Sequence, residues 1–99
     1  MDRQVELVAV LRRAVLEALG ATDEVDRRAA FIGEDVPEPW RGYVAMVREA
    51  SYRVSDAEVA GLLAAGHSED AVFEMTLAAA LGAANVRLDA GLRALRGAG

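Results

Sequence analysis

The chain has 99 residues, a formal net charge of −5 and 54% hydrophobic residues, which indicates one small domain. It contains no cysteine, and every one of its 11 basic residues is arginine, so disulfides, thiolate nucleophiles, cysteine-bound metals and Schiff-base chemistry on lysine are excluded. The acidic balance and the lack of a basic cluster argue against binding to nucleic acid and to anionic membrane surfaces.

The first segment predicts a helix from about residue 2 to residue 19 that stops at Gly20. Four of its charged residues fall in one narrow stripe, and its apolar residues spread over much of the remaining surface. A helix this apolar is normally covered on more than one side, so we expect it to be the first candidate for a contact between subunits. The stripe holds Asp2, Glu6, Arg13 and Glu17, and the apolar residues are Val5, Val8, Leu11, Val15, Leu16 and Leu19.

The next segment predicts a short second helix. Thr22 suits its N-cap, because a threonine hydroxyl accepts a hydrogen bond from a free backbone N–H of the first turn. Asp23 and Glu24 then stand in that turn, where the helix dipole favours negative charge. We expect this helix to end between Phe31 and Gly33.

A third helix is predicted to start at Asp35, a carboxylate cap that is followed three residues later by the acid Glu38. It should continue to about Ser51, because its apolar residues follow amphipathic helical spacing. Trp40 is expected to be an anchor of the core rather than a platform for a ligand. The aligned residues are Trp40, Tyr43, Val44, Val47 and Ala50.

Ser55 and Glu58 form the sequence pattern of a capping box, which predicts the start of a fourth helix. Gly66 is the expected left-handed stop of that helix. The residues expected to face the core are Val59, Leu62 and Leu63.

The last helix is predicted to be unusually long. Ser68 caps it, Glu69 and Asp70 stand in its first turn, and it reaches Arg96, a length of about 40 Å at about 1.5 Å per residue. Its surface divides into a leucine stripe, a polar side, and a strip of small residues around one arginine, Arg87. The stripe holds Leu77, Leu81, Leu88, Leu92 and Leu95; the polar side holds Glu74, Asn85, Asp89, Arg93 and Arg96; the small strip holds Ala80, Ala83, Ala84, Gly91 and Ala94.

Together these segments predict an all-α fold, a compact bundle of about five helices in a single domain. The chain offers more apolar side chains than one small core needs, so we expect a homo-oligomer, with a well-packed monomer rich in alanine as the alternative. No signal peptide is predicted, and the longest near-apolar run, residues 71–84, is too short to span a bilayer. We therefore expect a cytoplasmic protein, and its arginine-for-lysine composition is typical of GC-rich bacterial coding.

Four motifs stand out in the second half of the chain: the capping run 54–59, the glycine stop and second cap within 65–74, the alanines 78–80, and the Arg87-Leu88 pair. They resemble the carboxymuconolactone decarboxylase family, which includes the alkylhydroperoxidase D-like (AhpD-like) proteins. The resemblance covers about Trp40 to Leu95, which divides the domain into N-terminal helices (1–35) and a family-like core (36–96). It implies an AhpD-like all-helical fold that forms trimers or hexamers.

The peroxidase branch of that family uses a Cys-x-x-Cys pair and a nearby histidine, and a low-pKa thiolate attacks the peroxide. One register of the comparison places Ser51 and Val54 at the cysteine positions and Glu58 near the histidine position. The register that we prefer matches residues 55–95 to the cysteine-free half that follows the redox helix. The thiols are missing in both registers, so thiol peroxidase activity is excluded.

The decarboxylase branch does not depend on a cysteine pair. Its chemistry on an acidic lactone would need a cation for the carboxylate and an acid/base group. Arg87, lined by small side chains, is the candidate ligand-binding residue, because a guanidinium can hold a carboxylate in bidentate fashion. The alternative is a structural ion pair, within the domain or between subunits. No catalytic residue, cofactor or metal site is assigned.

Two further residues have both a structural and a functional interpretation. His67, the single histidine, is expected to be a surface loop residue rather than a general base, and one histidine with scattered carboxylates is not a metal-ligand set. Glu74 is expected to be solvated on the polar side of the last helix, or else to pair with an arginine of another helix.

The sequence therefore favours a non-catalytic, redox-dead AhpD-like helical module that self-associates. The alternatives are a cysteine-independent, decarboxylase-like enzyme and a binding protein, each acting on a small organic acid held by Arg87.

Overall fold

A computed structural model describes residues 20–98, and this part of the protein is all-helical. It contains the α-helices α2 (Glu24–Ile32), α3 (Arg41–Ala50), α4 (Asp56–Ala64) and α5 (Glu69–Ala98), with a 3₁₀ turn, η2 (Ser51–Arg53), between α3 and α4. The predicted all-α class is confirmed over these residues. The helix predicted over residues 2–19 lies outside them, so the count of five helices stays a prediction.

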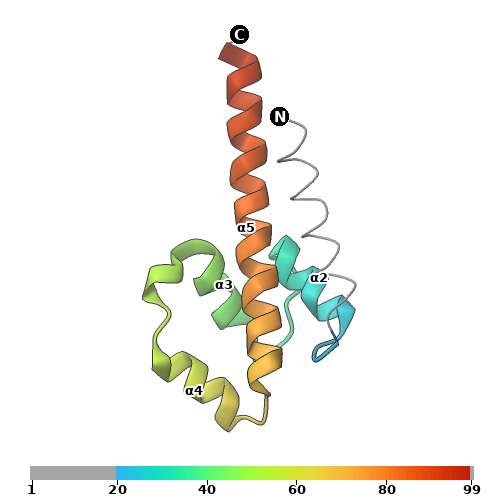
Figure 1. Cartoon of the computed structure of the whole chain (residues 1–99), viewed down its shortest axis with the longest axis vertical. Coiled ribbons are helices and arrows are strands. Elements are labelled where there is room, and N and C mark those ends of the chain that lie inside the picture. The colour runs from blue at the N-terminus through green and yellow to red at the C-terminus, as the bar shows by residue number, and fades with distance from the viewer. Residues whose placement is uncertain (1–19, 99) are drawn as a thin grey trace.

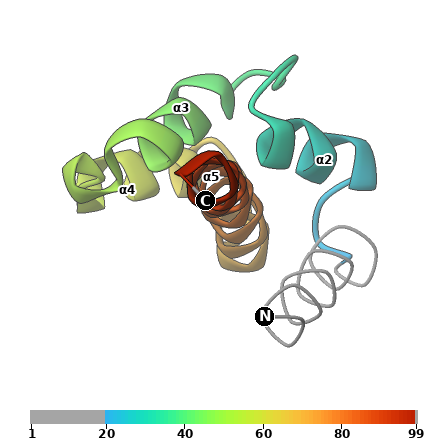
Figure 2. The ribbon, with the colours of Figure 1, turned by 90° about the horizontal axis from the view of Figure 1, so that it is seen from above.

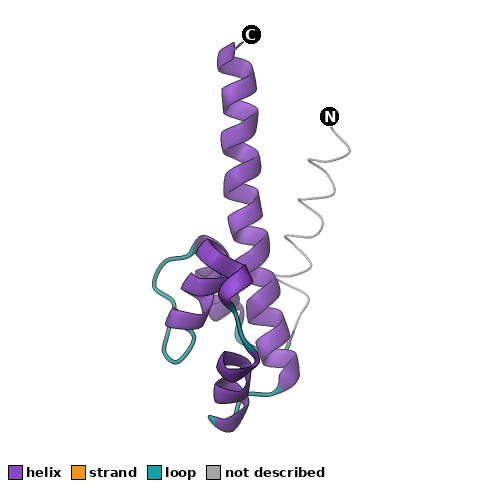
Figure 3. Ribbon diagram, turned by 90° about the vertical axis from the view of Figure 1, so that its left-hand side faces the viewer, coloured by secondary structure: helices purple, strands orange, loops and turns teal. Residues whose placement is uncertain are grey.

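Helix α5 is the axis around which the other described elements are arranged (Figure 1). Helices α2 and α3 pack against its first half, and α4 contacts it more briefly. Viewed from above, α3 and α4 lie on one side of α5 and α2 lies on another (Figure 2). The second half of α5 extends well beyond these three helices (Figure 3), and none of its residues from Ala84 to Gly97 is buried. Only the first half of α5 therefore contributes to the core.

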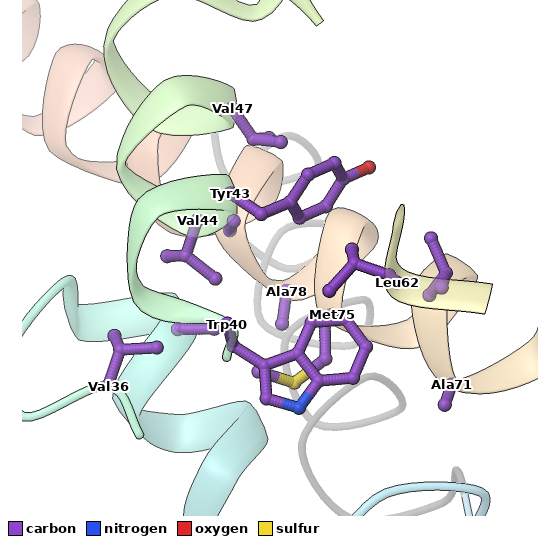
Figure 4. Close-up of a cluster of buried hydrophobic side chains, with 12 residues drawn as sticks. Val36, Trp40, Tyr43, Val44, Val47, Leu62, Ala71, Met75 and Ala78 are labelled. Atoms are coloured by element: carbon purple, nitrogen blue, oxygen red, sulfur yellow. The ribbon is translucent and has the colours of Figure 1, made fainter. Parts of the chain in front are cut away.

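The core forms where the apolar face of α3 packs on the first half of α5 (Figure 4). Val44 and Met75 are the largest side chains that are fully enclosed, and Trp40 is 4% exposed, as predicted for a core anchor. Helix α5 presents Ala78 and Ala79 here, and such small side chains let neighbouring helices approach closely. The other buried residues of this cluster include Ala30, Val36, Tyr43, Val47, Leu62, Ala71 and Val72.

The predicted start of α4 and the predicted boundary between α4 and α5 are confirmed. The N–H of Ser55 donates to the Glu58 carboxylate at 2.8 Å, and the two residues form the capping box. Gly66 ends the α4 segment with a φ of 102°, in the left-handed region. The hydroxyl of Ser68 accepts the Ala71 N–H at 3.0 Å and so caps α5.

The predicted start of the third helix at Asp35 is wrong, since α3 begins at Arg41. Pro37 and Pro39 explain the delay, because proline lacks the N–H group and disfavours a helical conformation in the residue before it. Asp35 has a φ of 57°, a left-handed conformation that does not suit an N-cap. The predicted end near Ser51 agrees with the observed change from α3 to the 3₁₀ turn.

The predicted N-cap of the second helix is also wrong, because Asp23, and not Thr22, occupies that position. The Asp23 side chain makes no capping hydrogen bond. A carboxylate from α5 binds the preceding N–H groups instead, as described below. The helix ends at Gly33 with a φ of 84°, within the predicted range.

Several leucines are more exposed than their pattern suggests. Leu63, expected to face the core, is 36% exposed. Within the leucine stripe of α5, Leu88 is 36% and Leu95 is 71% exposed. The buried side of α5 is formed largely by small residues, because α2 and α3 lie too close to it for larger side chains.

Candidate functional site

Glu74 lies on the buried side of α5 and is 5% exposed. Its carboxylate accepts the backbone N–H groups of Ala21 at 2.9 Å and Thr22 at 3.0 Å, and the Thr22 hydroxyl at 2.8 Å. The guanidinium of Arg27, a residue 2% exposed, lies 3.6 Å from the same carboxylate. The expectation of a solvated Glu74 is wrong, and the alternative, a pairing with an arginine of another helix, is confirmed.

The Glu74 carboxylate acts as a cap supplied from outside α2. It binds N–H groups just before the helix and places negative charge at the positive end of the helix dipole. Burial raises the pKa of Glu74, but the hydrogen bonds from Ala21 and Thr22 and the charge of Arg27 outweigh burial, so the net pKa lies below the ordinary value of 4.5. Glu74 is therefore ionised at neutral pH and holds helices together rather than exchanging protons.

A second polar contact closes the other end of α2. Arg48 of α3 donates from Nη1 to the carbonyl oxygens of Ala30 at 3.2 Å and Phe31 at 2.5 Å. Carbonyls in the last turn of a helix lack helical partners, and a cation there is favoured by the dipole. Gly82 of α5 lies at the same place, where an added Cβ would come within 1.8 Å of the Phe31 oxygen. Helices α2, α3 and α5 thus meet at a joint with no room for a side chain at position 82.

A hollow of about 170 Å³ lies between the turn after α2 and the outward side of α3. Its charged lining is balanced, with two arginines and two acids: Arg41, Arg48, Asp35 and Glu49. Arg41 donates from Nε to the Val36 oxygen at 3.1 Å, and Arg48 is engaged with the end of α2. Because both guanidinium groups already bind the protein itself, the hollow is not a prepared anion site.

Arg87, the candidate ligand-binding residue, is exposed on α5 and does not line this hollow. Its Nη2 donates to the Arg48 carbonyl oxygen at 2.9 Å, near the end of α3. Among residues 20–98, no carboxylate forms an ion pair with it. Its role in this part of the chain is therefore one exposed hydrogen bond between α5 and α3.

We expect Arg87→Met to lower the free energy of unfolding by no more than about 1 kcal/mol, because it removes one exposed hydrogen bond. If Arg87 also holds small acids, millimolar succinate or citrate should raise the melting temperature of the wild type but not that of the variant. Arg93→Met is the control, since Arg93 is exposed on the same helix and pairs with Asp89 at 2.7 Å. A loss above about 3 kcal/mol would instead indicate a buried ion pair.

His67 lies in the loop between α4 and α5, as predicted, but it is half-buried. Its ring centroid is 4.6 Å from that of Trp40, with the planes tilted by 51°. The histidine thus packs on the core anchor rather than standing free in a surface loop. Over the described residues, no three potential ligands among His, Asp and Glu side chains are grouped so as to hold a metal ion.

Helix α5 also carries a line of apolar and small residues, which we name the outer face; all of them are exposed except Leu77, which is half-buried and packs against the core cluster. They recur every three or four residues and lie within about 40° of Ala84, at about 100° per residue. Phe73 and Leu95, near its two ends, are 61% and 71% exposed. Arg87 borders it. The outer face consists of Phe73, Leu77, Ala80, Ala84, Leu88, Gly91 and Leu95.

By length and composition alone, α5 could also cross a membrane, because an 18-residue window within Glu69–Gly97 has a mean hydropathy of 1.3. The sequence expectation considered only the shorter run 71–84. Of the window that passes this test, 44% is buried inside the protein, and the core helix of a soluble protein passes the same test. This is weak evidence for a membrane span, and the cytoplasmic location stays a prediction.

Comparison of the chain with protein-family models, with curated proteins and with solved structures found no match. The resemblance to the carboxymuconolactone decarboxylase family therefore stays a prediction, and so do the AhpD-like fold and the trimer or hexamer that it implies.

Three residues that hold the helices together, Arg27, Arg48 and Gly82, were not identified from the sequence. A signal existed for two of them. An acid within the apolar run 71–84 calls for a buried basic partner, and a glycine inside a helix costs about 1 kcal/mol against alanine, which indicates a close approach. No sequence feature singles out Arg48.

Proposed function

We propose that this chain is a non-catalytic helical module that associates with itself through the outer face of α5. The observation that carries the proposal is the exposure of six of the seven residues of that face, which runs from Phe73 to Leu95 over most of the helix. A continuous exposed apolar face is a mark of an interaction surface. The polar clusters around Glu74 and Arg48 are, by contrast, satisfied within the protein and bind its own helices.

A redox-dead AhpD-like module is the fold family that we propose, and a trimer or hexamer is the assembly that the resemblance implies. The all-helical architecture with a long last helix supports this proposal, and the absence of cysteine supports the loss of thiol chemistry. We further propose a cytoplasmic, bacterial protein without a nucleic-acid or membrane partner.

We expect the wild type to sediment as an oligomer at low micromolar concentration and Ala84→Arg to weaken association at least about 10-fold, or about 1.4 kcal/mol. Ala84 lies in the middle of the outer face, so an arginine there would place a charge in the contact and desolvate it. Analytical ultracentrifugation over a concentration series measures both dissociation constants.

The matched control is Ala90→Arg, which adds the same side chain to another exposed alanine of α5. Ala90 lies about 120° around the helix from Ala84, away from the outer face. It should leave association unchanged. A monomeric wild type at these concentrations, or equal loss in both variants, would contradict the proposal.

The second candidate function is binding of, or catalysis on, a small organic acid at Arg87. The exposed guanidinium supports it, because arginine has five N–H donors and the contact to Arg48 uses one of them. The succinate and citrate melts of the wild type and of Arg87→Met, described above, test this alternative.

A further inference from the structure

We propose that the partner on the outer face is a second copy of this chain, whose α5 lies antiparallel to the first and crosses it at Ala84. This proposal rests on the proposed self-association and adds its orientation and alignment. A two-fold contact of this kind uses the same surface on both subunits, so that surface must be complementary to itself. The residues of the outer face meet this requirement.

The sizes of the side chains match at the inner levels of this arrangement, while Phe73 and Leu95, each eleven residues from Ala84, place two large side chains level at each end. Leu77 lies seven residues before Ala84, and Gly91 lies seven residues after it. In an antiparallel pair that crosses at Ala84, Leu77 of one copy therefore lies opposite Gly91 of the other. Ala80 and Leu88, four residues away on either side, likewise place a small residue level with a large one. Alternation of large and small residues lets two helices interdigitate, and the central alanine permits their close approach.

The charges at the two ends match as well. The first turn of α5 is acidic, with Glu69 and Asp70, and the basic residue of its last turn is Arg96. In the antiparallel pair, Arg96 of one copy comes level with the acidic turn of the other, within about 5 Å along the axis at about 1.5 Å per residue. Arg96 lies about 120° around the helix from Ala84, so its long side chain would flank the outer face rather than enter it. The helix dipoles then oppose each other, which is favourable.

A parallel pair would lose both matches. Leu88 of one copy would lie opposite Leu88 of the other, and Gly91 opposite Gly91. The two leucines would crowd the contact, and the two glycines would leave a gap in it. The acidic turns of the two copies would also lie side by side. The antiparallel arrangement further explains why α5 extends past α2, α3 and α4 (Figure 1): the extended half of each copy covers the outer face over the first half of the other.

The absence of cysteine makes the alignment directly testable, because single-cysteine variants have no competing thiol. A disulfide requires Cα atoms within about 7 Å. In the antiparallel pair, Ala84→Cys should link to itself after diamide oxidation. Ala80→Cys alone and Leu88→Cys alone should not, since eight residues, or about 12 Å, separate the two copies of each.

The decisive sample is an equal mixture of Ala80→Cys and Leu88→Cys, one carrying a tag that changes its mass. We expect a disulfide-linked heterodimer as the main product on a non-reducing gel. Ala90→Cys, off the outer face, is the negative control, and circular dichroism melts verify that each variant folds. Ala80 and Leu88 are both exposed, so these variants should keep the wild-type fold.

Each result decides between arrangements. Self-linking of Ala80→Cys and of Leu88→Cys without a heterodimer shows a parallel pair and overturns this inference, while an oligomeric mass leaves the proposed self-association standing. A trimeric mass also overturns it, because a two-fold pair builds dimers, tetramers or hexamers. A monomeric mass overturns both proposals, and if Ala84→Arg then lowers the melting temperature, residues 1–19 of the same chain are indicated as the occupant.

Discussion

Gly82→Ala is expected to lower the melting temperature by on the order of 10 °C. A Cβ at this position would come within 1.8 Å of the Phe31 carbonyl oxygen and 2.6 Å of Arg48 Nη1, so α2 would have to move away from α5. Overpacking of this kind costs about 1–3 kcal/mol, and each kcal/mol moves the midpoint by about 4–8 °C in a domain of this size. Thermal unfolding followed by circular dichroism measures the change.

The control is Gly61→Ala, at a position inside α4 where an added Cβ meets nothing within 4 Å. Alanine is the better helix former, so this variant should gain up to about 1 kcal/mol. Both substitutions add one methyl group to a helix, but their effects on the free energy of unfolding should have opposite signs. A Gly82→Ala variant that melts at or above the wild type would show that α2 and α5 do not meet as described.

Glu74→Leu should cost about 3–5 kcal/mol in the free energy of unfolding at neutral pH. The change removes the carboxylate that faces the buried guanidinium of Arg27 and leaves the N–H groups of Ala21 and Thr22 without that acceptor. Urea denaturation measures the loss. Asp89→Leu is the control, because its ion pair with Arg93 is exposed, and such pairs contribute at most about 1 kcal/mol.

The pH dependence of stability distinguishes the contribution of the Glu74 charge from that of its packing. The pKa of Glu74 is lower in the folded protein than its ordinary value of 4.5, so ionisation contributes stability that is fully present above that value. The contribution is lost as the pH falls through the folded-state pKa. The free-energy difference between wild type and Glu74→Gln should therefore stay constant above about pH 5.5 and shrink in acid.

A difference that stays unchanged down to pH 3 would contradict this account of Glu74. The pKa of Glu58 is also lowered, mainly by the hydrogen bond from the Ser55 side chain and then by the one from the Ser55 backbone. The wild type and Glu74→Gln both contain the pair of Ser55 and Glu58, so its contribution cancels in the free-energy difference between them.

Helix boundaries set by local chemistry were predictable from the sequence. The capping box of Ser55 and Glu58, the left-handed Gly66 and the Ser68 cap involve residues only a few positions apart, and each lies as predicted. The predicted start of α3 was wrong because a carboxylate followed by an acid resembles a cap, whereas Pro37 and Pro39 disfavour a helical conformation in the residues before them.

The orientation of α5 about its own axis was not predictable. Over residues 71–84 nearly every position is apolar, so the periodicity does not select one side. Close approach by α2 and α3 placed the small residues Ala78, Ala79 and Gly82 on the buried side. The same approach turned Glu74 inward, where the N-terminus of α2 and Arg27 receive its charge.

The candidate ligand-binding residue Arg87 stays a prediction. Arg87 is exposed, and its contact to the Arg48 oxygen depends on where α3 ends. Such a contact between residues distant in the chain follows from tertiary packing. The outer face, by contrast, is a repeat of three and four residues that is visible in the sequence, and only the structure shows which side of α5 remains uncovered.

The part of α5 that follows Ala83 has a consequence for folding. It spans about four turns, and none of its residues up to Gly97 is buried. Propagation beyond the packed first half adds little free energy per residue, so these turns are marginally stable in water. If a second copy docks on the outer face, as we propose, it would stabilise these turns, and the helical content of the chain would then rise with its own concentration by mass action. Assembly and completion of the fold would be a single coupled equilibrium, with dilution fraying the C-terminal turns first.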